Sequence, residues 1–186
     1  RMKVLNFLIA FAGLLIGLNG GVVFAQAEKQ SLHTTELQKD HIKDELNRRE
    51  LAYLLAPIKS NADLHIHLST ATDSPLDRLS SHAKWLFVDS LIFGRRGLGS
   101  YRYDILEEEL TLTEIYSVLS LFGVQHTTPM LKNAKSVSKA DALIMESGQA
   151  LGWVSRPPGE DYPDYWCSSR ATCTQSMNHI CIGTNC

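Results

Sequence analysis

Apolar residues after position 36 recur near helical spacing, and charged residues lie largely on the other faces. These apolar positions are Leu37, Ile42, Leu46, Tyr53 and Leu54. The pattern predicts an amphipathic helix. Pro57 indicates that this helix ends at about Ala56, because the residue before a proline is disfavoured in the α conformation.

A second helix is indicated by Ser74-Pro75, an N-cap residue followed by proline at the first helical position. Apolar residues then mark one face as far as Gly94, where the helix is expected to end. Shorter helical patterns cover residues 101–110 and 138–148.

Thr111-x-x-Glu114 has the sequence of a capping box, in which each side chain hydrogen-bonds the backbone N–H of the other residue. Gly123 is suited to end the following helix in the left-handed conformation. Together, these patterns predict a mainly α protein: a small domain of about four helices with a disulfide-stapled, irregular C-terminal tail.

Residues 62–68 are the exception, because apolar and polar side chains alternate there as they do in a half-buried strand. No second run alternates as clearly, so a sheet is not expected. In a strand, His65 and His67 would lie on one face, within reach of one cation.

Asp63-Leu-His65-Ile-His67 resembles the metal-binding strand of amidohydrolase-type enzymes. That resemblance implies a small metal-dependent hydrolase with His65 and His67 as ligands. The family's barrel scaffold usually needs about 250 residues, more than the 186 present here. The favoured interpretation is therefore a solvated strand edge, with no metal site, no cofactor and no catalytic residue.

The beginning of the sequence has the features of an export signal. Met2-Lys3 precedes an apolar run from Val4 to Leu18, and small residues at Ala25 and Ala27 follow at the spacing that a signal peptidase reads. We therefore assign residues 1–27 to a signal peptide. The alternative is an uncleaved membrane anchor, because the run is about long enough to span a bilayer.

The charge balance argues against some classes of partner. Removal of residues 1–27 would leave 16 basic and 20 acidic residues, a net charge of −4. A mildly acidic protein without a basic stripe is not suited to nucleic acid or to an anionic membrane surface. After signal cleavage we expect a secreted or periplasmic protein that contacts neither.

The four cysteines are confined to one short stretch: Cys167, Cys173, Cys181 and Cys186. An even number of cysteines in an exported chain most simply forms disulfides, here two, and four cysteines allow three pairings. A zinc site is a weaker interpretation, because structural zinc sites usually contain C-x2-C pairs. The tail is therefore expected to be stapled covalently.

Composition divides the mature chain into three parts: a helical domain over residues 28–152, a proline-rich acidic linker over 153–165 and the cysteine-rich tail over 166–186. Several aromatic residues surround the junction. Trp153, Tyr162, Tyr165 and Trp166 could pack over the disulfides or anchor a partner.

The function that these features favour is that of an exported, non-enzymatic protein. Its stapled tail would be a structural cap or a protein-binding surface, with a protein as the expected partner. Two alternatives stay open at this point: the metal-dependent hydrolase, and a precursor from which a secreted cysteine-rich peptide is released after about Gly159.

Overall fold

The computed structural model describes residues 39–150 and 160–186. The chain divides into two units, Arg1–Asp40 and His41–Cys186, and all contacts given below lie within the second. The expected signal peptide and Trp153 fall outside the described residues. In the described part of the chain, no helix is both long and apolar enough to span a lipid bilayer.

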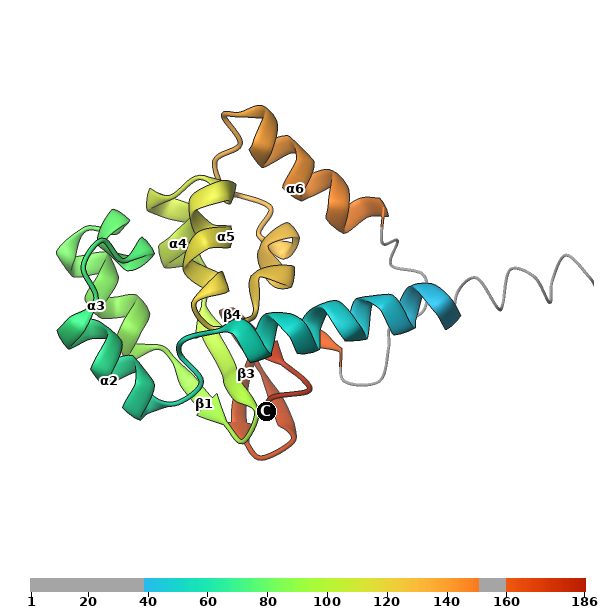
Figure 1. The fold of residues 1–186 in the computed structure, drawn as a ribbon, viewed down its shortest axis with the longest axis horizontal. Coiled ribbons are helices and arrows are strands. Elements are labelled where there is room, and N and C mark those ends of the chain that lie inside the picture. The colour runs from blue at the N-terminus through green and yellow to red at the C-terminus, as the bar shows by residue number, and fades with distance from the viewer. Residues whose placement is uncertain (1–38, 151–159) are drawn as a thin grey trace, which may run out of the picture. The chain divides into compact units, whose positions relative to one another are not determined.

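A helix over residues 39–55 comes first and ends within one residue of the position that Pro57 indicates. Helices and strands follow in a mixed order (Figure 1). The helices are α2 (Asn61–Thr70), the 3-10 helix η1 (Pro75–Arg78), α3 (Ser81–Asp89), α4 (Asp104–Glu109), α5 (Leu112–Ser120), the 3-10 helix η2 (Gln125–Met130) and α6 (Lys139–Ala150). The strands are β1 (Ile92–Gly94), β2 (Gly97–Arg102), β3 (Asp161–Ser169) and β4 (Thr172–Ile182).

The expectation of a mainly α fold with an irregular tail is wrong. The four strands form one antiparallel sheet in the order β1-β2-β4-β3, so the fold is mixed α/β. β4 pairs with β2, with Ser100 opposite Cys181 and Arg102 opposite His179. The cysteine-rich segment therefore supplies part of the central sheet, and residues 161–165, assigned above to a linker, begin β3.

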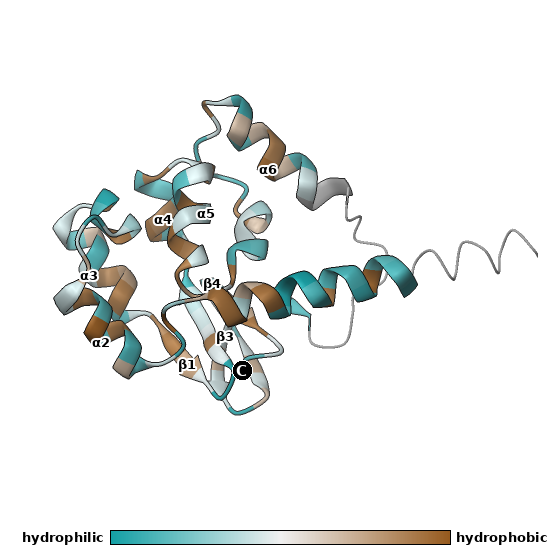
Figure 2. Ribbon diagram, viewed as in Figure 1, coloured by the Kyte–Doolittle hydropathy of each residue, from teal (hydrophilic) through white to brown (hydrophobic). Residues whose placement is uncertain are grey.

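One hydrophobic core joins the helices to the sheet. Phe87 of α3 contacts Tyr101 of β2 and Phe122, which follows α5, in edge-on geometry with ring centroids 6.2 Å apart in each pair. Ile180 and Ile182 of β4 belong to the same buried cluster. Figure 2 shows hydrophobic and hydrophilic residues alternating along the helices and strands. Burying each large apolar side chain stabilises the fold by about 1.5–3 kcal/mol.

The capping signals are confirmed, but the helix that follows the first of them is shorter than expected. Ser74 and Asp77 form a capping box at the start of η1. That helix ends at Arg78, and Ser80 caps a separate helix, α3, by accepting from the N–H of Ala83. The apolar spacing runs through both helices, which is why the sequence alone suggested one.

The capping box of Thr111 and Glu114 is present at the start of α5. Gly123 follows that helix with φ of +71°, as expected of a left-handed stop. A Cβ at Gly123 would also lie 2.8 Å from the Cα of Tyr53. The glycine therefore lets the first helix approach the end of α5 closely.

Candidate functional site

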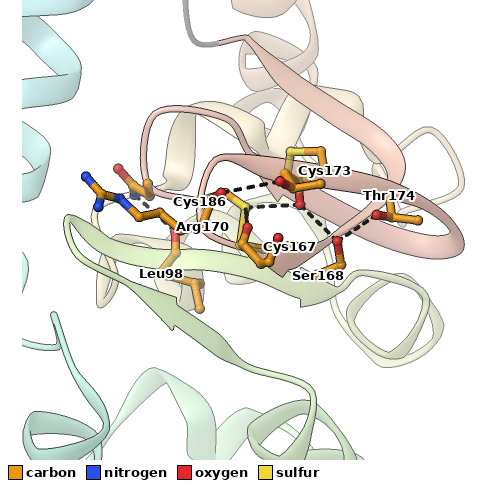
Figure 3. Close-up of a disulfide and its surroundings, with 11 residues drawn as sticks. Leu98, Cys167, Ser168, Arg170, Cys173, Thr174 and Cys186 are labelled. Atoms are coloured by element: carbon orange, nitrogen blue, oxygen red, sulfur yellow. Dashed lines mark hydrogen bonds between the residues drawn. A yellow bond between two sulfur atoms is a disulfide. The ribbon is translucent and has the colours of Figure 1, made fainter.

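The four cysteines form two nested disulfides, Cys167–Cys186 and Cys173–Cys181. This confirms a disulfide-stabilised C-terminal segment and selects one of the three pairings that the sequence left open. No described cysteine is free. Both bridges lie within or next to the β3–β4 hairpin (Figure 3).

The inner bridge shows that the hairpin is folded back on itself. Cys173 and Cys181 are eight residues apart in β4, yet their Cα atoms are 5.9 Å apart. Eight residues of extended strand would span about 26 Å. The chain must therefore reverse direction between the two cysteines, and the disulfide holds the two halves of β4 together. We call this arrangement the folded hairpin, residues 161–186.

The reversal occurs at a corner where β3 and β4 bend together. Asp164 in β3 and Asn178 in β4 both have left-handed backbone angles, with φ of 62° and 66°. The Asp164 carboxylate accepts hydrogen bonds from the Tyr103 hydroxyl at 2.7 Å and from the Asn178 N–H at 3.1 Å. Desolvation, together with the Asp164 carboxylate, raises the pKa of Tyr103, so this hydroxyl stays a donor at neutral pH.

The corner brings two tyrosines together. Tyr162 and Tyr165 would face opposite sides of a regular strand, because side chains alternate along it. The pairing with β4 shifts between Pro163 and Tyr165, and as a result the two tyrosine rings lie 5.7 Å apart. They line an open pocket of about 380 Å³ together with Ala171, Cys173 and Gly183.

The other aromatic residues singled out in the sequence are placed differently. Trp166 packs edge-on against His179, with ring centroids 6.5 Å apart, and stays 39% exposed. Met177, an apolar residue at the corner that no sequence pattern marked, is 77% exposed. The structure thus groups Tyr162 with Tyr165 and places Trp166 outside their pocket.

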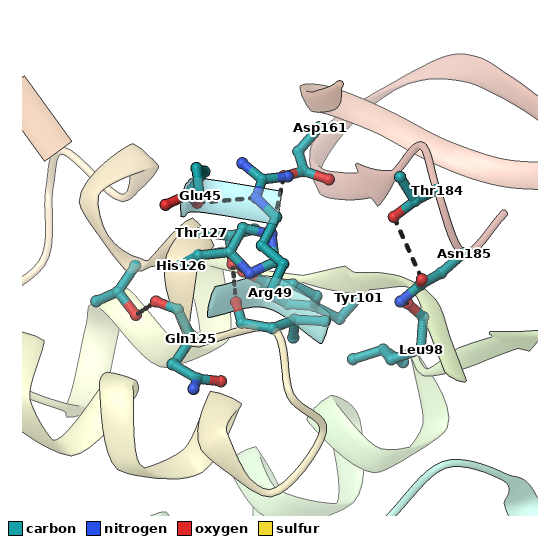
Figure 4. A network of polar contacts seen from close by, with 12 residues as sticks. Glu45, Arg49, Leu98, Tyr101, Gln125, His126, Thr127, Asp161, Thr184 and Asn185 are labelled. Atoms are coloured by element: carbon teal, nitrogen blue, oxygen red, sulfur yellow. Dashed lines mark hydrogen bonds and ion pairs between the residues drawn. The ribbon is translucent and has the colours of Figure 1, made fainter. Parts of the chain in front are cut away.

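The folded hairpin is attached to the rest of the protein by a buried carboxylate that sequence reasoning missed (Figure 4). Asp161 at the start of β3 is 2% exposed, and one of its oxygens binds Arg49 at 2.8 Å and His126 at 2.9 Å. Glu45 holds the other side of the Arg49 guanidinium at 2.9 Å. Burial alone would raise the pKa of Asp161, but His126 and Arg49 hold it below its usual range.

A second hollow of about 400 Å³ lies beside Tyr103 and carries mainly acidic side chains. Two of these carboxylates already have partners within the protein. Asp104 forms an ion pair with Arg102, and Glu107 accepts from the backbone N–H of Asn133 at 2.9 Å. Their contacts identify them as structural groups that join β2, α4 and the segment after η2.

The structure does not place His65 and His67 on a strand. Residues 61–70 are helix α2, and two residues separated by two positions point about 200° apart around a helix. His65 is exposed, whereas His67 hydrogen-bonds the Ser74 hydroxyl at 2.8 Å. The strand expectation is wrong because only Leu64 of the alternating apolar residues is buried. The geometry on which the hydrolase resemblance rests is therefore absent.

Comparisons of the chain with protein-family models, with curated proteins and with solved structures found no match.

Proposed function

We propose that this chain is an exported, non-enzymatic protein whose folded hairpin binds a protein partner through the pocket of Tyr162 and Tyr165. The observation that carries the proposal is the pairing of these rings beside a surface that two disulfides hold in shape. Tyrosine offers a large contact area with few side-chain torsions to order on binding. A covalently rigid surface also loses little conformational entropy when a partner binds.

The composition of the pocket favours binding over catalysis. Its lining contains two tyrosines, two small residues and a cysteine whose sulfur is already in a disulfide. The lining lacks a free thiol, a carboxylate and an imidazole, three of the groups that act as nucleophile or general base in enzymes. A pocket with aromatic walls, open to solvent, is typical of a surface that receives a side chain of a partner.

The precursor alternative fits the structure less well. Release of a peptide after about Gly159 would remove β4 from its pairing with β2, and it would remove Asp161 from Arg49. Ile180 and Ile182 would leave the core at the same time. A segment that is built into the sheet in this way is better suited to stay attached and to present its outer side.

The partner surface can be tested by photocrosslinking. A photoreactive phenylalanine derivative at Tyr165 is expected to form one defined adduct when the protein is exposed to the envelope or culture fluid of its source. The matched control is the same derivative at Tyr116, an exposed tyrosine of α5. For the purified partner, Tyr165→Ala should weaken binding by about 2 kcal/mol, about thirtyfold in Kd, whereas Tyr116→Ala should not. Identical adducts at both positions would contradict the proposed surface.

Export can be tested independently of the partner. We expect the secreted or periplasmic form of the full chain to begin at Gln26 or Glu28, because cleavage after Ala25 or Ala27 suits the small residues there. The measurement is intact mass and amino-terminal sequencing of the exported protein. Leu14→Arg should block export, since a charge interrupts the apolar run. Recovery of an uncleaved, membrane-bound chain would favour the anchor instead.

A further inference from the structure

The two disulfides lie side by side, although each closes a different loop. The sulfur atoms of Cys173, Cys181 and Cys186 are all within 4.8 Å of one another, the one such group of possible ligand side chains among residues 39–150 and 160–186. Two of these sulfurs form the inner bridge, and the third belongs to the outer bridge. The sulfur of Cys167 is not a member of the group. Figure 3 shows the outer bridge beside Cys173.

Cys186 is held in this position by contacts that do not depend on its own disulfide. Its backbone N–H donates to the Ile182 carbonyl, and its carbonyl accepts from the Ala171 N–H, both at 2.9 Å. The side-chain amide of Asn185 donates to the Leu98 carbonyl at 3.0 Å. A thiolate formed on Cys186 would therefore stay next to the inner bridge, at a high effective concentration.

The exposure of the four cysteines determines where a reductant can enter. Cys186 and Cys173 are partly exposed, whereas Cys167 and Cys181 are buried. A thiol from solvent can therefore reach the Cys186 side of the outer bridge. A sulfur on Cys186 can in turn reach the exposed side of the inner bridge.

We propose that Cys186 is a thiol-exchange site through which a dithiol reductant opens the inner bridge by attacking the outer one. One thiolate of the dithiol attacks Cys186, and Cys167 leaves as a thiolate and takes up a proton. The second thiol of the dithiol resolves the mixed disulfide, which oxidises the dithiol and releases the Cys186 thiolate. This thiolate attacks Cys173, forms a Cys173–Cys186 bond and releases Cys181, which takes up a proton. The dithiol loses two electrons, and the protein gains them as two thiols.

This exchange changes the shape of the proposed binding surface. A Cys173–Cys186 bond still crosses the corner, because Asn178 lies between these residues, but it joins positions 13 residues apart instead of eight. Cys167 of β3 and Cys181 of β4 are both freed, so attack on the outer bridge alone would loosen the hairpin. The exchange involves only the sulfur atoms and takes place whether or not the pocket binds a partner.

A matched pair of variants of the full chain tests the proposal, since each breaks the outer bridge. Cys167→Ser leaves its free thiol at Cys186, inside the sulfur group. Cys186→Ser leaves its free thiol at Cys167, outside it. Both proteins are equilibrated in a dilute glutathione buffer at pH 8, trapped with an alkylating agent and mapped by mass spectrometry. In Cys167→Ser we expect a non-native Cys173–Cys186 bridge. Its amount should be at least about tenfold higher than that of any non-native bridge in Cys186→Ser.

Two outcomes overturn the proposal. Either both variants keep the Cys173–Cys181 bridge, or both rearrange to the same extent, as unfolded chains would. The unmodified protein provides a second readout that needs no variant. With less than one equivalent of dithiothreitol, exchange leaves one thiol on Cys167 and the other on Cys181. If direct reduction alone takes place, the two thiols belong to one native bridge.

Discussion

Replacing Asp161 with alanine is expected to lower the free energy of unfolding by about 2–4 kcal/mol at pH 7. The carboxylate is buried, and one of its oxygens receives hydrogen bonds from both Arg49 and His126. Its loss leaves two partly buried nitrogen groups without their acceptor. Arg49 keeps its contact with Glu45, so the loss should not exceed this range. Urea denaturation measures the effect. The control is Asp89→Ala, since Asp89 is an exposed aspartate of α3. Its free energy of unfolding should stay within about 0.5 kcal/mol of the wild-type value.

The same contacts make the contribution of Asp161 dependent on pH. His126 and Arg49 hold the pKa of the folded-state carboxyl below its usual range, despite burial, which acts in the opposite direction. A group whose folded pKa is depressed stabilises the protein above its unfolded pKa, about 3.9 for aspartate. This stabilisation is lost as the pH falls through the folded pKa. The difference in free energy of unfolding between wild type and Asp161→Ala should therefore be largest at pH 5–7 and shrink below about pH 4. A difference that stays constant with pH would contradict the ion-pair explanation.

Loss of either disulfide is the second large effect. The chain-entropy model gives about 2.5 kcal/mol for the eight-residue separation of Cys173–Cys181 and about 3 kcal/mol for the 19-residue separation of Cys167–Cys186. We expect Cys173→Ser/Cys181→Ser to lower stability slightly less than Cys167→Ser/Cys186→Ser. Each double variant removes one whole bridge, so no unpaired thiol remains to exchange.

The two double variants should differ more in local opening than in stability. Both bridges cross the corner, but the inner one closes the shorter loop, so its removal should speed amide hydrogen exchange at Gln175–His179 more than removal of the outer bridge does. Hydrogen exchange followed by mass spectrometry, alongside thermal unfolding, separates the two effects. Equal exchange at the corner in both variants would argue against the inner bridge as the tighter constraint on the corner.

The helices could be predicted where local chemistry determines them. Ser74, Thr111 and Gly123 act through their own side chains or backbone angles, so the sequence places them correctly. The alternation over residues 62–68 led to a wrong prediction because burial does not follow it. Ile66 points to solvent at 61% exposure, and the helix is set by the Ser60 cap and Asp63.

The sheet could not be read from the sequence because its strands lack the usual composition. β2 contains two glycines and a serine yet is almost entirely buried, so it shows no alternation. β3 contains Pro163, which is tolerated because β3 lies at the edge of the sheet. β4 is polar along most of its length, and its buried apolar residues are its last three, two of which pair with β2.

The candidate site was located in part. The cysteines and the neighbouring tyrosines indicated the correct segment, because disulfides and aromatic clusters are visible in composition. The corner was not visible, since Asp164 and Asn178 take left-handed angles only in the context of Tyr103. The ion pair of Arg49 with Asp161 joins residues 112 positions apart, and no local pattern indicates such a partner.

The pairing of β2 with β4 also affects the order in which the chain can fold during synthesis. β2 ends at Arg102, but β4, which pairs with it, begins only at Thr172. About seventy further residues must therefore be synthesised before the open edge of β2 can be covered. An uncovered edge is a template for pairing with other chains. Nascent molecules should therefore be most prone to aggregate just before the hairpin emerges. A chaperone or a fast-closing disulfide at that late stage would decide the yield of folded protein.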